Sequence, residues 1–250
     1  SRFYAHDFYH LLARRAVDMY KEWRGFNVDS LMDRRIEDVY QTMIATYRQR
    51  PGAEDAVVMS TLDYEQWRTE MQSPDGYLQV LDSLIAAYGT RDVCGEVYIR
   101  KAQWLNDKRR YAQALRVCDE GLKRYAAYKR IGELKNIRAL ILLPELNIHT
   151  AEGYPSDSVS MRVHYCNLSG FTLNVYATDY NERPWLDDDI TSSVCRRHGR
   201  LLASHRFALR PLPGKGKAAE DVPYHSCDTT LHFRLPDDVG VYILQAVPEG

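Results

Sequence analysis

The sequence predicts an α+β protein of two domains, in which α-helical hairpins are followed by an antiparallel β-sandwich. Apolar residues recur at helical spacing up to Leu143, and from Pro144 onward they alternate with polar residues. The length of 250 residues also exceeds the roughly 150 expected of one domain. We therefore expect an α-helical domain over 1–143 and a β-sandwich domain over 144–250, with the boundary between Leu143 and Asp157.

Two long helices are expected first. The first, of about 19 residues, has apolar side chains that step by three or four positions and so share one face. These side chains are Phe8, Leu12, Ala16, Met19 and Trp23. The second begins at Ser30, a residue type that caps helices, and ends before Pro51-Gly52. Its stripe consists of Met32, Ile36, Val39, Met43 and Tyr47.

A third and a fourth helix follow, and we interpret the helices as pairs. The third stripe is Met59, Leu62, Trp67 and Met71. Ser73-Pro74-Asp75 then combines a capping side chain, a proline suited to the first helical position and an acid that favours the positive end of the helix dipole. The stripe of this fourth helix is Leu78, Leu81, Ile85 and Tyr88, and Gly89 ends it.

The best-defined pair of helices spans 95–128. Its aromatic and small residues fall at the positions typical of a 34-residue tetratricopeptide unit. They are Gly95, Tyr98, Ala102, Tyr111, Ala114 and Gly121. The small residues are expected where two antiparallel helices approach closely. The segment resembles a tetratricopeptide repeat, although any helical hairpin with a tight crossing needs small residues at such positions.

The second half of the chain has the alternation of strands. The runs 159–165 and 171–177 flank the turn residues 167–170, which predicts a hairpin of two half-buried strands. Further strands are expected over 201–209, 229–235 and 241–247, and a short helix over 187–197. Strands at this spacing, separated by Gly, Pro and Asn, are typical of a small sandwich. The segment Lys215-Gly-Lys is expected to be an exposed loop.

The run Cys94-Gly-Glu-Val97 is similar to the Cys-Gly-Glu-Gln of proteins that form an internal thioester. That bond joins the cysteine sulfur to the carbonyl of the glutamine side chain. Val97 has no side-chain carbonyl, so the thioester cannot form here. We expect Cys94 to be an inert, partly buried thiol at the start of a helix.

Three short pairs of histidine and cysteine could each offer two ligands to one zinc ion. They are His164-x-Cys166, Cys195-x-x-His198 and His225-x-Cys227. Their spacings differ, as expected of a chance distribution, and we predict no metal site. Cys195 and Cys227 could instead form a disulfide in an oxidising compartment.

The charge balance disfavours polyanionic partners. Lys and Arg number 33 against 34 Asp and Glu, and no apolar run approaches the roughly 20 residues that span a bilayer. We therefore expect neither nucleic acid binding nor membrane contact. Basic residues nevertheless outnumber acidic ones from Arg100 to Arg138, which suggests a partner-docking face. Its candidate residues are Arg109, Arg110, Lys123 and Arg124. The alternative is that these charges are solvated and serve solubility alone.

No motif in the sequence indicates catalysis. A Gly-rich phosphate loop, a nucleophile elbow and a paired-carboxylate constellation are all missing. The run Asp187-Asp188-Asp189 lacks the alternating oxygen ligands of a calcium loop. We predict no catalytic residue, no cofactor and no enzymatic activity.

Five segments together resemble bacterial alpha-2-macroglobulin family proteins. They are the helical run 8–20, the degenerate repeat that ends near Tyr125, the transition 146–152, the strand region 161–168 with its Tyr-Cys-Asn, and the ending Leu-Pro-Asp-Asp-Val-Gly-Val-Tyr-Ile-Leu at 235–244. The resemblance implies helical repeats followed by a first macroglobulin-like domain. It further implies that the chain is an N-terminal piece of a much larger extracytoplasmic protein, in the periplasm or cell envelope and tethered to a membrane.

Members of that family trap or inhibit proteases. The resemblance implies that this segment has scaffold and docking roles, because neither a bait region nor a thioester can be placed on it. The implied partners are neighbouring macroglobulin-like domains of the parent chain, and a protease or an envelope protein. An alternative function is that of a free-standing tetratricopeptide-like adaptor that binds a protein or peptide in its concave groove.

Overall fold

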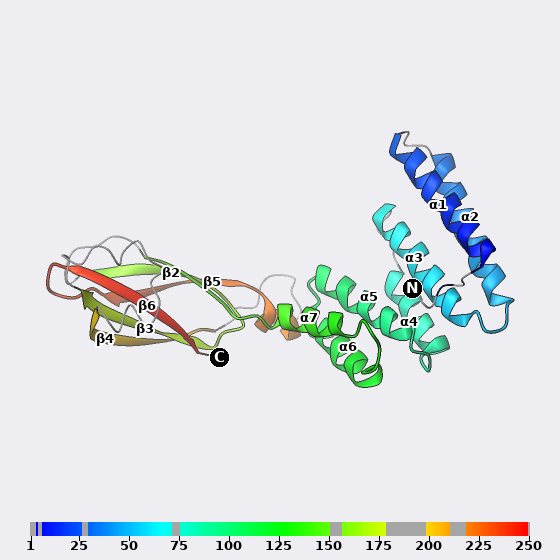
Figure 1. Ribbon diagram of the computed structural model, residues 1–250. Helices are drawn as coiled ribbons and strands as arrows, with labels where there is room; N and C mark the ends of the chain where they lie inside the picture. Colours follow the sequence, from blue (N-terminus) through cyan, green and yellow to red (C-terminus); the bar gives the residue numbers. More distant parts are fainter. Residues whose placement is uncertain are drawn as a thin grey trace. The chain divides into compact units, whose positions relative to one another are not determined.

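The computed structural model describes Tyr4 and residues 7–26, 30–71, 76–150, 157–178, 199–210 and 219–249. Within these ranges seven α-helices precede six strands (Figure 1), so the predicted order of helices first and strands second is confirmed. The chain divides into two compact units. One contains Ser1–Lys108 and Gln113–Arg138, and the other contains Arg109–Ala112 and Ala139–Gly250.

The helices agree with the sequence periodicity. Their bounds are α1 Phe8–Phe26, α2 Ser30–Arg48, α3 Glu54–Met71, α4 Tyr77–Tyr88, α5 Cys94–Asp107, α6 Tyr111–Arg124 and α7 Gly132–Ile141. The predicted helix starting signal at 73–75 lies outside the described residues. Asp7 caps α1, because its Oδ1 accepts a hydrogen bond of 2.8 Å from the backbone N–H of His10.

The first three helices share one apolar core. Val17 of α1, Ile36, Met43 and Tyr47 of α2 and Trp67 of α3 are buried in it. The α1 face that contacts α2 also contains Ala13 and Tyr20. The stripe predicted from Phe8 to Trp23 does share one face of α1, but that face points away from α2.

The small residues of the 95–128 pair are needed for packing, as predicted. A Cβ atom on Gly121 would lie 2.5 Å from Leu134 Cδ1 of α7 and 3.0 Å from Tyr98 Cδ1 of α5. Ala102 and Ala114 are fully buried. Helices α5, α6 and α7 therefore meet at a point where a larger side chain does not fit. The tetratricopeptide assignment itself stays a prediction.

The strands form two antiparallel sheets of three strands, in the orders β1-β2-β5 and β4-β3-β6. Their bounds are β1 Glu145–Thr150, β2 Ser158–Cys166, β3 Gly170–Thr178, β4 Gly199–Ala208, β5 Cys227–Arg234 and β6 Val241–Glu249. A 3₁₀-helix, η2, spans Ala219–Tyr224. The strand β1 was not predicted. The expected helix at 187–197 and the loop at 215–217 lie outside the described residues.

The predicted hairpin of 159–165 with 171–177 is wrong. These segments are β2 and β3, and they belong to different sheets. In a hairpin, adjacent strands bond side by side and their apolar faces point the same way. Here Met161 and Val163 of β2 share one buried cluster with Phe171 and Leu173 of β3. The chain therefore crosses between the sheets at 167–169, and both sheets contribute side chains to the same core.

Asn167 fixes this crossing. It has a positive φ of 54°, a backbone conformation that Asn tolerates better than most residues. Its Nδ2 donates hydrogen bonds to the carbonyl oxygens of Ile141 and Leu143, at 2.8 and 2.9 Å. These carbonyls lie at and just beyond the C-terminal end of α7, where the last carbonyls of a helix have no partner within the helix.

Candidate functional site

The four basic residues proposed for docking lie at the two ends of α6. Arg109 and Arg110 precede this helix of 14 residues, and Lys123 and Arg124 end it. At a rise of about 1.5 Å per residue, the two pairs are roughly 20 Å apart along the helix. The structure therefore does not gather them into one patch. As a docking set they stay a prediction.

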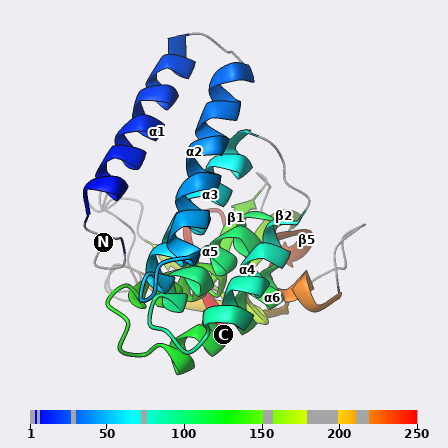
Figure 2. The same cartoon turned by 90° about the vertical axis from the view of Figure 1, so that its right-hand side faces the viewer.

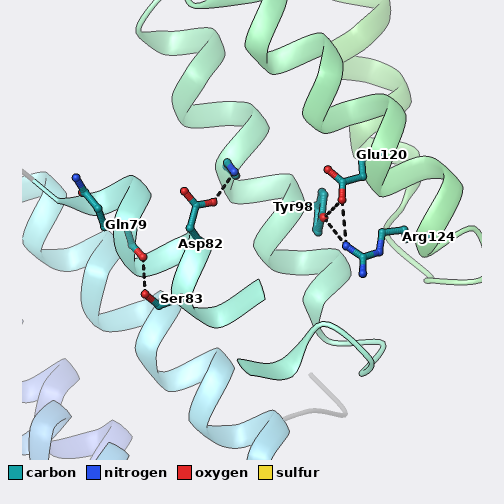
Figure 3. A network of polar contacts seen from close by, with 7 residues as sticks. Gln79, Asp82, Ser83, Tyr98, Glu120 and Arg124 are labelled. Carbon is teal, nitrogen blue, oxygen red and sulfur yellow. Dashed lines mark hydrogen bonds and ion pairs between the residues drawn. The ribbon is translucent and has the colours of Figure 1, made fainter. Parts of the chain in front are cut away.

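Arg124 is engaged in a local network with α5, shown in Figure 3. Its Nη1 donates to Tyr98 Oη at 3.1 Å and to Glu120 Oε1 at 3.0 Å. Tyr98 Oη donates in turn to Glu120 Oε1 at 2.6 Å. Burial, followed by this hydrogen bond to Glu120, raises the pKa of Tyr98 to about 12. The charge of Arg124 is thus partly neutralised by its own helix.

Some basic residues between Arg100 and Arg138 are likewise paired with acids. Lys101 Nζ lies 2.5 Å from Asp82 Oδ1 of α4, an ion pair also drawn in Figure 3. Arg138 Nε lies 3.0 Å from Asp119 Oδ1. Counting charges from Arg100 to Arg138 left out Asp82, because Asp82 lies outside that segment.

The Cys94-Gly95-Glu96 run has a packing role in the structure. Cys94 is fully buried, and burial raises the pKa of its thiol to about 11. A Cβ on Gly95 would lie 2.5 Å from Tyr128 Cδ1. The buried carboxylate of Glu96 accepts hydrogen bonds from Tyr128 Oη at 2.8 Å and Arg130 Nη1 at 2.6 Å. The three residues anchor the segment after α6 onto α5.

The pairs His164-x-Cys166 and His225-x-Cys227 lie on neighbouring segments, because Tyr165 pairs with Cys227 across β2 and β5, and the pair Cys195-x-x-His198 lies outside the described residues. Across the described ranges, no group of three His, Cys, Asp or Glu side chains is placed to hold a metal ion. His164 Nδ1 instead lies 2.9 Å from Asp228 Oδ1, its neighbour across β2 and β5. Cys227 is a free thiol, and Cys195 lies outside the described residues.

A groove that the sequence did not predict lies where α3, α4 and α5 meet. It is open to solvent and has a volume of about 190 Å³. Its lining residues are Gln66 and Thr69 of α3, Tyr77 of α4, and Arg100, Gln103, Trp104 and Asp107 of α5. The rings of Tyr77 and Trp104 lie 6.1 Å apart, and Lys108 Nζ lies 5.8 Å from the centre of the Trp104 ring. The wall is therefore aromatic with a cation beside it.

The polar groups of the groove are incompletely paired. Arg100 Nε is buried and has no hydrogen-bond partner among the residues described. Glu96 Oε1 is 3.8 Å away, a distance that fits an ion pair but is too long for a hydrogen bond. Burial raises the pKa of Tyr77, and the nearby Arg100 charge acts in the opposite direction.

No family, no curated protein and no solved structure matches this chain. The resemblance to alpha-2-macroglobulin proteins therefore rests on the residues quoted above. None of the described helices has the length and apolar character of a membrane-spanning segment.

The size and lining of the groove limit what it can do. Pockets for cofactors and drug-sized ligands have volumes of about 300–1,000 Å³. A groove of about 190 Å³ is smaller and suits one or two side chains of a polypeptide. Its lining offers aromatic surface, amides and a guanidinium. Sequence spacing could not reveal the groove, because three helices supply its residues and periodicity describes one helix at a time.

Proposed function

We propose that this chain is a non-catalytic docking and scaffold segment, in which the helical unit holds part of a protein partner. The observation that carries the proposal is the groove of α3, α4 and α5. Arg100 lines this groove with a side chain that is 30% exposed, and its guanidinium can donate hydrogen bonds to a carboxylate or carbonyl of the partner. The ring of Trp104 supplies the apolar contact beside it.

The resemblance extends this proposal to the parent protein. We propose an extracytoplasmic, membrane-tethered protease trap of the alpha-2-macroglobulin kind, in which the helices are tetratricopeptide-like and the strands form a macroglobulin-like β-sandwich. The order of helices before strands supports this, as does the core shared by the two sheets. The β-sandwich would pack against neighbouring macroglobulin-like domains, and the docked partner would be a protease or an envelope protein.

Peptide selection tests the groove directly. A displayed library of random peptides is selected against the 250-residue chain, and the affinity of the enriched peptides is then measured by fluorescence polarisation. We expect peptides with an acidic residue beside an apolar one. Arg100→Gln and Trp104→Ala should each weaken binding by at least about tenfold, the loss expected when one charged or aromatic contact is removed.

Lys135→Gln is the matched control, because Lys135 is an exposed cation of α7 away from the groove lining. It should bind the selected peptides as the unaltered chain does. Peptides that bind both groove variants with undiminished affinity, or a library that yields no binder, would refute docking at this site.

The groove equally favours the adaptor alternative, a free-standing tetratricopeptide-like protein that binds peptides. The gene sequence on both sides of the segment separates the two functions. A downstream series of predicted β-sandwich domains supports the protease trap, and a stop codon soon after the codon of Gly250 supports the adaptor. For the trap, the parent protein should block cleavage of a large protein substrate by a captured protease while leaving small peptide substrates accessible.

A further inference from the structure

The outer face of α1 is an uncovered apolar row. Phe8 is 72%, Leu12 52%, Met19 45% and Trp23 61% exposed. The opposite face of the same helix packs against α2 through Ala13, Val17 and Tyr20. Figure 2 shows α1 as the outermost helix of its unit, with α2 on one side. The row therefore faces away from the rest of the helical unit.

The row is large enough to be an interface. An aromatic side chain buries about 150–250 Å² when fully covered, so the row leaves on the order of 500 Å² exposed per molecule. The largest contiguous apolar patch on a soluble monomer is typically about 300–600 Å² and is often functional. Two such rows pressed together would bury about 1,000 Å², which is the lower limit for a specific interface and indicates a weak one.

Opposite charges flank the row on one edge. Arg15 and Glu22 are both exposed, and neither is in an ion pair within the described ranges. They are seven positions apart, so they lie two turns apart along the same edge of the helix. Ala16 lies on the other edge of the row, where its small side chain leaves space for a neighbouring side chain.

We propose that the row binds the same row of a second copy of this chain, with the two α1 helices antiparallel. In one alignment, apolar residues of the two helices lie opposite each other and opposite charges lie close together. This alignment places Leu12 opposite Trp23 of the other copy, and Met19 opposite the small Ala16. Arg15 then lies within about 3 Å, along the helix axis, of Glu22 of the other copy.

The two-fold symmetry repeats each of these contacts, as an isologous dimer requires. In a parallel pair, the edge of α1 that contains Arg15 and Glu22 would face the other edge of the second α1, so neither charge would meet its opposite. The charge pattern therefore selects the antiparallel direction. This inference is independent of the proposed groove function, because the row and the groove use different residues.

Sedimentation velocity of the 250-residue chain tests the dimer. The sedimentation coefficient should rise from the monomer to the dimer value as the concentration is raised from about 1 to 200 µM, because an interface this small is expected to be weak. Leu12→Glu and Met19→Glu should each give a monomer throughout. Leu140→Glu is the matched control, since Leu140 is an exposed leucine of α7, at 63% against 52% for Leu12, and its substitution should leave dimerisation unchanged.

Charge reversal tests the alignment. Arg15→Glu and Glu22→Arg should each raise the dimer dissociation constant by several-fold, and the double variant should restore it. Circular dichroism at 222 nm checks that every variant keeps its helices, which is expected because all the altered side chains are exposed. A chain that stays monomeric at the highest concentration would overturn the proposal, and a dimer insensitive to Met19→Glu would do the same. A double variant as weak as the single ones would overturn the antiparallel alignment.

Discussion

At the scale of single residues, the Cys94-Gly95-Glu96 run shows how a chemically suggestive motif can be a packing motif. Each residue has a separate structural reason: the thiol is buried, the glycine leaves room for the Tyr128 ring, and the carboxylate accepts two hydrogen bonds. A buried carboxylate that pairs with both a hydroxyl and a guanidinium is satisfied. The motif is thereby accounted for without any reaction.

The thiol of Cys94 should be unreactive in the folded chain. With a pKa of about 11, only about one thiol in a thousand is ionised at pH 8, and the thiolate is the reactive form. Iodoacetamide should therefore label the half-buried Cys166 and Cys227 long before Cys94, as mapped by peptide mass spectrometry. Methylamine should add no mass at Cys94, because Val97 supplies no acyl group. A methylamine adduct traced to this cysteine would contradict the prediction.

At the scale of elements, the helices pack closely where glycines leave room, and hydrogen bonds and ion pairs between side chains connect neighbouring strands. Gly95 and Gly121 allow the first kind of contact. The second kind is found on β6, where Glu249 Oε1 accepts a hydrogen bond of 2.9 Å from Thr172 Oγ1 of β3. Glu249 Oε2 also lies 2.7 Å from Arg206 Nη2 of β4. One carboxylate thus joins all three strands of its sheet.

Gly95→Ala should lower the free energy of unfolding of the helical unit by about 1–3 kcal/mol, the usual cost of overpacking a filled core. The new Cβ would lie 2.5 Å from the Tyr128 ring, which is held by its hydrogen bond to Glu96. Gly132→Ala is the control, because nothing lies within 4 Å of a Cβ there. It should be neutral or stabilising. Urea unfolding followed at 222 nm measures both, and equal effects would contradict the packing argument.

The sheet β4-β3-β6 should weaken in acid. The hydrogen bonds from Arg206 and Thr172 hold the pKa of Glu249 below its usual 4.5. A carboxyl whose pKa is lowered on folding stabilises the fold above the unfolded pKa and loses that contribution as the pH falls through the folded value. As the pH is lowered below about 4.5, the urea concentration at the unfolding midpoint of the β unit should decrease. This decrease should be smaller in Glu249→Gln than in the unaltered chain. Identical pH profiles would contradict the role of Glu249.

At the scale of the whole molecule, the core of α1, α2 and α3 and the core of the two sheets have no residue in common. Ile36 is fully buried in the core of α1, α2 and α3, and Met161 is fully buried in the core of the two sheets. Each unit thus has its own source of hydrophobic stabilisation, which is the physical basis for separate unfolding.

The two units should therefore unfold in separate transitions. Ile36→Ala and Met161→Ala should each cost about 2–5 kcal/mol, the usual loss for truncating a buried aliphatic side chain. The first should shift the transition seen by circular dichroism at 222 nm, which reports mainly helix. Met161→Ala should shift the unfolding transition of the β unit, which changes the circular dichroism at 222 nm only a little. One coincident transition that moves in both variants would show that the units unfold together.

Local periodicity in the sequence determined the kinds of elements and their order. The spacing of Phe8, Leu12, Met19 and Trp23 predicted a helix that the structure confirms as Phe8–Phe26. The small residues Ala102, Ala114 and Gly121 predicted a close approach of helices. Periodicity could do this because residues within one helix or strand share a face by geometry alone.

Only the tertiary structure determined which element, if any, packs against the apolar face of each helix and strand. The apolar row of α1 could have been core, yet it is exposed. The strands β2 and β3 could have paired, yet they lie in different sheets with their apolar sides in one core. The groove around Arg100 and Trp104 combines three helices. These outcomes depend on contacts between residues far apart in the chain, about which a local pattern carries no information.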